Sequence, residues 1–325
     1  MWKDQRICDL LEIEHPIVQA PMAGASTPEM AVATANAGGM GSLGCAMQTA
    51  EAIRGDVQRV RRGTNRAINL NFFVHKPPVP NLERARAAQE RLAGWYDRLD
   101  AGAMPKAVET HFPFDAAMCE AVLNIGPKAV SFHFGLPDAA LVSALKAGGI
   151  VIISSATSAA EARFLEANGA DVIVAQGYEA GGHSGWFLPR NHGEVAGTMA
   201  LVPRIVDAVD IPVLAAGGIG DGRGIAAALM LGAAGVQIGT AFLATPESAA
   251  SPTHKRALLA ASGDDTMMSE AFSGRKARTV VNAYARAMDR VDDWPDFPIM
   301  NTLSGPIRKA SARNNTPDAI ALWSG

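Results

Sequence analysis

The sequence predicts an α/β protein in which eight parallel strands close into a (β/α)8 TIM barrel. Short, continuously apolar runs recur eight times, and helical patterns follow several of them. Thirty-two glycines in 325 residues agree with many tight turns between strands and helices. A doubly wound parallel sheet is the alternative arrangement.

The first half of the chain contains four of the expected strands, at 16–20, 40–43, 67–73 and 129–134. A helix is expected over 27–37, because Thr27 suits the N-cap and Pro28 suits the first helical position. Helices are also expected over 49–62 and 139–147. The second half adds a helix over 159–168 and the strands 150–154, 172–175, 212–216 and 236–240.

Two segments depart from this alternation. Residues 76–113 begin with three prolines in four residues after Lys76 and continue as a charged helical pattern over 82–99, which indicates an insertion in the third unit. Residues 246–325 are expected to be helical but irregular, with several prolines. The predicted organisation is a barrel over 1–245 and a smaller C-terminal helical segment that, with the insertion, closes the barrel and covers the active site.

Composition excludes several classes of function. A formal net charge of −3 gives no broad electrostatic reason to bind nucleic acid or an anionic membrane. The N-terminus lacks an apolar signal region, so a cytoplasmic location is expected. Cys8, Cys45 and Cys119 have neither metal-ligand nor disulfide spacing, and we expect buried thiols and no metal site.

Polar residues at the ends of the predicted strands are the candidates for ligand contact, because TIM barrels bind ligands at that rim. They include Met22 after the first strand, Asn71 in the third, His133 in the fourth and Gln176 in the sixth. Asn71 and Gln176 could instead satisfy neighbouring main-chain groups, and His133, between two phenylalanines, could be a packed core residue.

The loop after the sixth predicted strand places His183 among the glycines 181, 182 and 185. We expect this histidine to act on a bound ligand, since a glycine-rich loop offers no core around it. The seventh and eighth strands end at Gly217–Gly218 and Gly239–Thr240. Small residues in two neighbouring loops expose amide donors, which favours a phosphate site there.

These residues belong to longer motifs that resemble the nitronate monooxygenase family, formerly called 2-nitropropane dioxygenases, in its long bacterial and fungal form. The resemblance runs almost from end to end. Its most specific pieces are Pro16-Ile-Val-Gln-Ala-Pro-Met-Ala-Gly24 and Ala175-Gln-Gly-Tyr-Glu-Ala-Gly-Gly-His-Ser-Gly185, with Ile68-Asn-Leu-Asn71, Ser131-Phe-His-Phe-Gly135, Pro212-Val-Leu-Ala-Ala-Gly-Gly-Ile219, Phe272-Ser-Gly-Arg-Lys-Ala-Arg278 and Leu322-Trp-Ser-Gly325.

The resemblance implies an FMN-dependent enzyme that oxidises alkyl nitronates, with propionate 3-nitronate as the expected substrate, using O2 and releasing nitrite. It implies a catalytic role for His183 and substrate contacts at His133 and Ser184. It also implies tyrosines near the pocket, where this C-terminal segment has only Tyr284. The implied FMN contacts are Met22, Asn71, Gln176, Gly181, Gly218, Gln237, Ile238, Gly239 and Thr240.

Two other functions stay open at this point. The first motif and Gly274-Arg-Lys-Ala-Arg278 also resemble FMN barrels that reduce enoyl thioesters or quinones with NAD(P)H. A flavin-free barrel that binds a sugar phosphate is the second alternative. A homodimer is an open alternative to a monomer, and no nucleic-acid or membrane partner is expected.

Overall fold

The computed structural model describes residues 4–108, 113–189, 196–289 and 291–325, and it divides into two compact units. The barrel unit comprises Met1–His75, Pro113–Ala180 and Gly185–Ala249. The second unit comprises Lys76–Phe112, Gly181–Ser184 and Ala250–Gly325. Residues 109–112 of the predicted insertion lie outside the described residues.

The barrel unit confirms the predicted (β/α)8 fold. Its parallel strands are ordered β1-β9-β8-β6-β5-β4-β3-β2, and a parallel bridge from Val18 to Met40 brings β1 beside the start of β2, so the ring is nearly closed. The strands are β1 (Ile17–Gln19), β2 (Gly41–Gly44), β3 (Ile68–Phe73), β4 (Ala129–His133), β5 (Val151–Ala156), β6 (Val172–Gln176), β8 (Val213–Ala216) and β9 (Gly235–Ile238).

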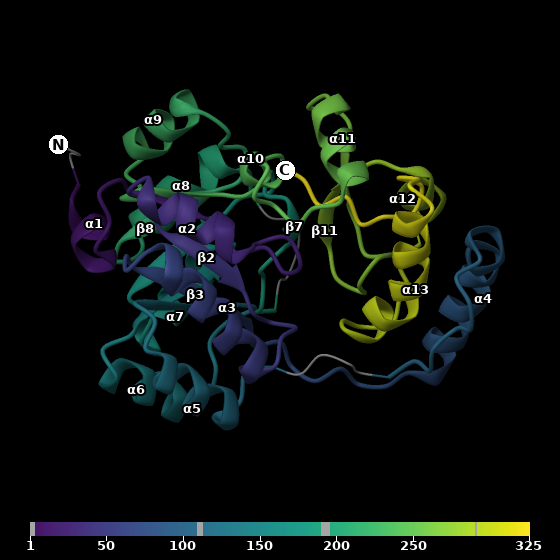
Figure 1. Ribbon diagram of the computed structural model, residues 1–325, viewed down its shortest axis with the longest axis horizontal. Helices are drawn as coiled ribbons and strands as arrows, with labels where there is room; N and C mark the ends of the chain where they lie inside the picture. The colour runs from purple at the N-terminus through teal and green to yellow at the C-terminus, as the bar shows by residue number, and fades with distance from the viewer. Residues whose placement is uncertain (1–3, 109–112, 190–195, 290) are drawn as a thin grey trace. The chain divides into compact units, whose positions relative to one another are not determined.

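Helices surround these strands (Figure 1). Thr27 caps α2 through a bond from the Met30 amide, with Pro28 at the first position, as expected. Five helices of this unit, α1, α5, α8, α9 and α10, were not predicted from the sequence. The helices of this unit are α1 (Arg6–Leu11), α2 (Pro28–Asn36), α3 (Ala50–Gly63), α5 (Ala116–Ile125), α6 (Ala139–Ala147), α7 (Ala159–Ala167), α8 (Thr198–Val206), α9 (Gly222–Met230) and α10 (Thr240–Leu243).

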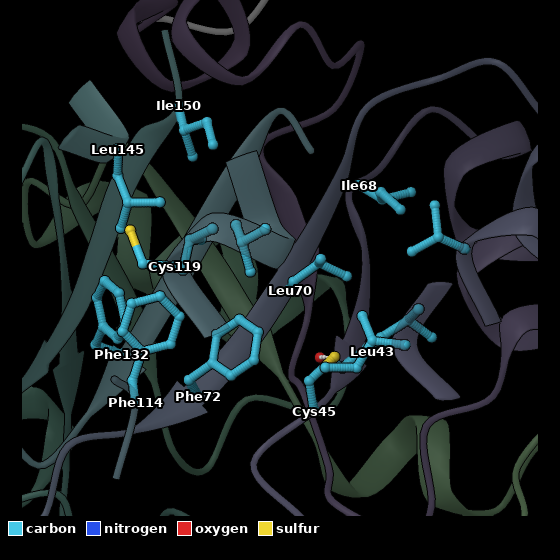
Figure 2. Close-up of a cluster of buried hydrophobic side chains, with 14 of the residues drawn as sticks. Leu43, Cys45, Ile68, Leu70, Phe72, Phe114, Cys119, Phe132, Leu145 and Ile150 are labelled. Atoms are coloured by element: carbon cyan, nitrogen blue, oxygen red, sulfur yellow. Dashed lines mark hydrogen bonds between the residues drawn. The ribbon is translucent and has the colours of Figure 1, made fainter. Parts of the chain in front are cut away.

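Apolar side chains fill the space between strands and helices, as in the cluster of Figure 2. The rings of Phe72 and Phe114 are 4.9 Å apart, and those of Phe114 and Phe132 are 5.2 Å apart. All three cysteines are free and buried, and burial raises the pKa of Cys45 to about 12. These thiols are therefore packing groups, as the sequence suggested.

The second unit combines helices with a small antiparallel sheet. The sheet, ordered β10-β11-β7, contains β7 (Gly182–His183), β10 (Thr266–Ser269) and β11 (Ala277–Val280). The C-terminal segment, which was expected to be helical but irregular, therefore contains two strands as well as helices. β10 is only four residues long, and its first residue, Thr266, lies opposite Val280 of β11. The pairing is therefore not visible as a local pattern in the sequence. The helices are α4 (Leu82–Leu99), α11 (Pro252–Ala260), α12 (Ala283–Ala287) and α13 (Ile299–Arg313).

Helices α4 and α13 lie side by side although about two hundred residues separate them (Figure 1). The Tyr96 hydroxyl of α4 donates to the Leu303 carbonyl of α13 at 2.6 Å. Around this contact Leu92, Phe272, Tyr284 and Leu303 are buried in one apolar cluster. The predicted insertion and the C-terminal segment thus share a core. That they cover the active site stays a prediction.

No helix in the described part of the chain is long and apolar enough to cross a lipid bilayer.

Candidate functional site

Polar side chains connect β2, β3 and β4 inside the barrel. Asn69 donates from Nδ2 to the hydroxyls of Ser42 and Ser131 at 3.2 and 2.9 Å. Asn71 donates from Nδ2 to the Ser131 hydroxyl at 3.0 Å and to the Ser131 carbonyl at 3.2 Å. Its Oδ1 makes no hydrogen bond to a described residue. The Asn71 amide nitrogen is therefore structural, whereas its carbonyl oxygen can accept from a ligand N–H.

The ends of β4, β5 and β6 bring His133, Ser155 and Gln176 around Gly185. His133 Nδ1 lies 2.6 Å from Ser155 Oγ, and Gln176 Oε1 accepts the Gly185 N–H at 2.7 Å. A Cβ on Gly185 would lie 2.7 Å from His133 Cε1 and 2.8 Å from Ser155 Oγ. Glycine at 185 thus lets the main chain pass directly over both side chains.

His133 has features of both interpretations that the sequence left open. Its ring is half-buried and lies 4.4 Å from the Phe134 ring and 6.0 Å from the Phe73 ring. The same ring is hydrogen-bonded at the carboxyl end of β4. It is packed, yet it stands at the rim where TIM barrels bind ligands.

Met22 lies in a tight turn after β1. Its N–H donates to the Ser26 hydroxyl at 2.8 Å, and its carbonyl accepts from the Ala25 and Ser26 amides. Gly44 at the end of β2 passes close to this turn, because a Cβ there would lie 2.6 Å from the Ala23 nitrogen. The position of Met22 is therefore fixed by its own main chain and by β2.

The turn after β8 has a backbone that requires glycine. Gly217 and Gly218 have φ of +111° and +69°, in the left-handed region. A Cβ on Gly217 would lie 2.8 Å from the Ala180 nitrogen. Two successive residues without side chains leave the main chain of this turn open to a close ligand, which fits a phosphate group.

Two helices begin near this turn. Asp221 caps α9 by accepting from the amides of Arg223 and Gly224, and the Arg223 guanidinium lowers the pKa of the Asp221 carboxyl to about 2. That helix start already holds its own anion. The short helix α10 begins at Thr240 after Gly239, and no described side chain caps it. A phosphate between the last two barrel loops and a short extra helix is the common TIM-barrel arrangement.

The predicted flavin contacts on and after β9 differ in how far their side chains are exposed. The Ile238 side chain is buried in the core, and its carbonyl accepts from the Ala20 amide at 2.8 Å, so contact with a ligand would have to come from its main chain. Gln237 and Thr240 are half-buried. β9 lies between β8 and β1, with Gln237 opposite Ala216 and Ile238 opposite Gln19.

His183 lies in the second unit, on the two-residue strand β7 opposite Ala277 of β11. Its Nε2 is 2.9 Å from the Ser273 hydroxyl. Its half-buried ring lies 5.5 Å from the Phe297 ring and 5.4 Å from the Trp323 ring. The expectation of a loop without surrounding core was therefore wrong, because β11 and two aromatic rings from distant sequence surround this histidine.

Its neighbour Ser184 has a buried hydroxyl without a hydrogen-bond partner among the described residues. The main chain of Ser184 is fixed by bonds to the Lys276 carbonyl at 2.9 Å and from Arg275 Nε at 3.3 Å. A buried hydroxyl without a partner is unfavourable, so a ligand would stabilise it by supplying one.

Two further residues have structural explanations. A Cβ on Gly181 would lie 2.6 Å from the Gly325 nitrogen, so the C-terminal tail alone explains glycine at this position. Tyr284 is fully buried, and its hydroxyl donates to the Ala271 carbonyl at 2.8 Å. Tyr284 is thus part of the core of the second unit. A flavin contact at Gly181 stays a prediction.

The tail that passes Gly181 pairs with β11 through one isolated antiparallel bridge. The Val280 amide donates to the Leu322 carbonyl at 2.8 Å, and Trp323 bridges to Thr279. His254 Nε2 is 3.2 Å from the Trp323 carbonyl, which can only accept, so His254 donates. Burial lowers the pKa of His254 from its ordinary value of 6.5.

We expect His254 to make the protein less stable in acid. A histidine whose pKa is lowered by folding contributes stability above its unfolded pKa of 6.5, and this stability is lost as the pH falls below that value. Wild type should therefore lose more Tm than His254→Gln between about pH 7.5 and about pH 5.5. Thermal unfolding followed by circular dichroism measures both. Equal losses in the two proteins would contradict the assignment.

The predicted residues thus fall into two groups. The barrel unit brings Met22, Asn71, His133, Gln176, Gly218 and residues 237–240 to the carboxyl ends of its strands, and the second unit holds Gly181, His183 and Ser184.

Sequence reasoning missed the roles of Ser155, Ser273 and Phe297. Ser273 and Trp323 lay within motifs noted for their resemblance, which was the only signal for them. The described residues contain no cluster of three His, Cys, Asp or Glu able to hold a metal ion.

Comparison with known proteins agrees with the geometry. The family model described as nitronate monooxygenase matches residues 4–325. A probable nitronate monooxygenase of Staphylococcus aureus (strain Newman) is 39% identical over 331 residues, covering 100% of this chain and 92% of the relative.

Solved structures are similar as well. Nitroalkane oxidase from Streptomyces ansochromogenes has a TM-score of 0.90 and 38% identity, over 98% of this chain and 91% of its own. FabK from Thermotoga maritima has a TM-score of 0.74 and 29% identity, over 100% of this chain and 89% of its own.

Proposed function

The chain belongs to the nitronate monooxygenase family, and from this premise we propose that it oxidises alkyl nitronates with O2 to a carbonyl compound and nitrite. The observation that carries the proposal is the family match over residues 4–325, which includes both units. Propionate 3-nitronate is the proposed substrate, and a cytoplasmic location is proposed with it.

We propose FMN as the flavin of this enzyme. Its phosphate would lie at the Gly217–Gly218 turn and at residues 239–240, where the main chain carries no bulky side chain. The Asn71 carbonyl oxygen would accept from an N–H of the ring, and Met22, Gln176 and Gln237 would line it. When bound, FMN supplies the electron transfer between substrate and O2.

His183 is proposed to handle charge and protons at the substrate. Its protonated ring would donate a hydrogen bond to the nitronate anion and offset its negative charge. With a neutral nitroalkane, the unprotonated ring would instead remove the α-proton as a general base. The Ser184 hydroxyl, which has no hydrogen-bond partner in the described part of the chain, supports a second polar contact with the substrate, and His133 is proposed as a third.

An aerobic nitrite assay tests the proposal. The purified protein is expected to contain FMN, and on addition of propionate 3-nitronate it should consume O2 and release nitrite. Boiled protein and free FMN at the same concentration are the controls, because nitronates also oxidise without enzyme. FMN-loaded protein that releases nitrite no faster than these controls would disprove the proposal.

The same sample tests an NAD(P)H-dependent reductase, the weaker alternative. The similarity to FabK is lower than that to nitroalkane oxidase in both identity and TM-score. Anaerobic mixing with NADPH should leave the flavin absorbance almost unchanged if the proposed function is correct. Rapid bleaching would favour the reductase.

A further inference from the structure

Arg308 on α13 is a partly buried cation without a counter-ion in the described part of the chain. Its Nη2 donates to the Asn301 carbonyl at 2.9 Å and to Asn301 Oδ1 at 2.7 Å, two turns earlier on the same helix. Its Nε is buried and has no hydrogen-bond partner among the described residues. Burial lowers the pKa of the guanidinium to about 10, so the side chain is still charged at neutral pH.

A buried charge is unfavourable unless an opposite charge compensates it, and the partner Asn301 is neutral. The acidic residues on either side of α13 are engaged elsewhere. Asp296 pairs with Arg84 at 3.7 Å, and Asp318 pairs with Arg98 at 3.0 Å. The described chain therefore leaves this guanidinium to be neutralised by an anion from outside.

The guanidinium lies at the end of α13 that is also linked to His183. Through its bonds to Asn301 it reaches the first turn of the helix. Phe297, four residues before Asn301, packs edge-on against the His183 ring. A second link runs from the Ser304 hydroxyl of α13 to the Phe272 carbonyl, next in the chain to the serine that lies 2.9 Å from His183. All these residues belong to the second unit, which thus holds the cation and the imidazole near one another.

Gly305 leaves space beside the guanidinium. Apart from the backbone of the helix itself, the only atom within 4 Å of a Cβ at position 305 would be Arg308 Nη2, at 3.9 Å. Glycine inside a helix is less favourable than alanine, and no close packing requires it here. With the partial exposure of Arg308, this space lets a small ligand approach the charged group.

We propose that Arg308 binds the carboxylate of the nitronate substrate, while His183 contacts the nitronate group. This inference rests on the proposed function, because propionate 3-nitronate carries two anionic groups, a nitronate and a carboxylate, joined by a short carbon chain. A guanidinium is a strong hydrogen-bond donor to a carboxylate. Arg308 is therefore a specificity-determining residue that favours nitronates bearing a carboxylate over simple alkyl nitronates.

Steady-state kinetics with propionate 3-nitronate and propyl-1-nitronate test this assignment, because the second substrate has a methyl group in place of the carboxylate. In Arg308→Met the ratio of their kcat/KM values should fall about 10- to 100-fold, the effect of one charged hydrogen bond. Arg308→Lys keeps a cation and should lose less. Arg313→Met is the matched control, because Arg313 is an exposed residue of the same helix that donates to the Asp100 carbonyl. An unchanged ratio in Arg308→Met, or an equal loss in Arg313→Met, overturns the proposal.

Binding of succinate separates this inference from the proposed function. Succinate carries two carboxylates at the spacing of the substrate's two anionic groups, and its binding needs no turnover. Its Kd for FMN-loaded protein, measured by isothermal titration calorimetry, should rise about 10- to 100-fold in Arg308→Met and stay the same in Arg313→Met. Equal binding to wild type and Arg308→Met, or none to wild type, overturns the carboxylate site. If succinate distinguishes the variants while neither nitronate yields nitrite, the proposed function fails and the anion site at Arg308 stands.

Discussion

Replacing His183 with asparagine is expected to lower kcat/KM for neutral nitroalkanes about 10²- to 10⁴-fold, while turnover of nitronates falls far less. Asparagine can still donate a hydrogen bond to an anion, but it has no nitrogen that can accept a proton at neutral pH. A nitroalkane must lose its α-proton on the enzyme, whereas a nitronate has already lost it. The two substrates therefore separate the role of a base from that of a hydrogen-bond donor.

The measurement is steady-state kinetics with nitroethane and ethylnitronate on wild type and His183→Asn. Bound FMN, measured from flavin absorbance, should be the same in both proteins. His15→Asn replaces an exposed histidine of the barrel unit and should change neither rate. Equal losses with both substrates would refute the base, and loss of flavin would show that His183 holds the cofactor instead.

The barrel could be predicted from the sequence because its information is local. Each strand is a short apolar run, and the barrel helices α2, α3 and α7 are capped by Thr27, Thr49 and Ser158, side chains that accept from first-turn amides. The observed strands differ from the predicted ranges by one or two residues. Parallel strands joined by helices leave few arrangements, so counting eight of them was enough to identify the closed barrel.

The small sheet could not be predicted in the same way. β7 has only two residues, and its partner β11 lies about ninety residues further along the chain. A two-residue strand has no alternating pattern, and the glycines around it indicate a loop. The surroundings of His183 were hidden for the same reason, because Ser273, Phe297 and Trp323 come from three separate segments.

At the barrel rim, the sequence identified residue types more reliably than the bonds that they make. Asn71 and Gln176 were recognised as unusual polar residues in apolar strands. Their structural partners, Ser131 and the Gly185 amide, could not be deduced, since each lies on another segment. The result is that one end of each amide is used within the protein while Asn71 keeps a carbonyl oxygen for a ligand.

Glu161 binds the main chain that follows Gly185, at Phe187 and Leu188. Among the substitutions considered, Glu161→Gln is expected to have the largest effect on stability. The carboxylate is 1% exposed. Its Oε2 accepts from the Thr157 amide at 2.7 Å and hydroxyl at 2.6 Å, and its Oε1 accepts from the amides of Phe187 at 2.8 Å and Leu188 at 3.2 Å. Four donors thus converge on one buried anion, which fixes residues 187–188 to the start of α7.

Glutamine has the same shape but only one acceptor oxygen. Turned one way, its NH2 group faces the Phe187 and Leu188 amides, and both lose their acceptor in a buried place. Turned the other way, it faces the Thr157 amide, which loses this acceptor, while the Thr157 hydroxyl can turn and accept from the NH2 group. We expect the free energy of unfolding to fall by roughly 2–5 kcal/mol, with a decrease in Tm of several degrees. Thermal and urea unfolding measure this loss. FMN affinity should fall as well, because Gly185, bonded to Gln176, lies two residues before Phe187.

Glu166→Gln is the matched control on the same helix. Glu166 accepts from the Asp210 and Ile211 amides at 2.7 and 3.1 Å, but both bonds reach a single oxygen, Oε1. A glutamine can keep that oxygen in place and turn its NH2 group away from both donors, so little stability should be lost. If the two variants were equally stable, the four-donor contact of Glu161 would not be what holds this segment.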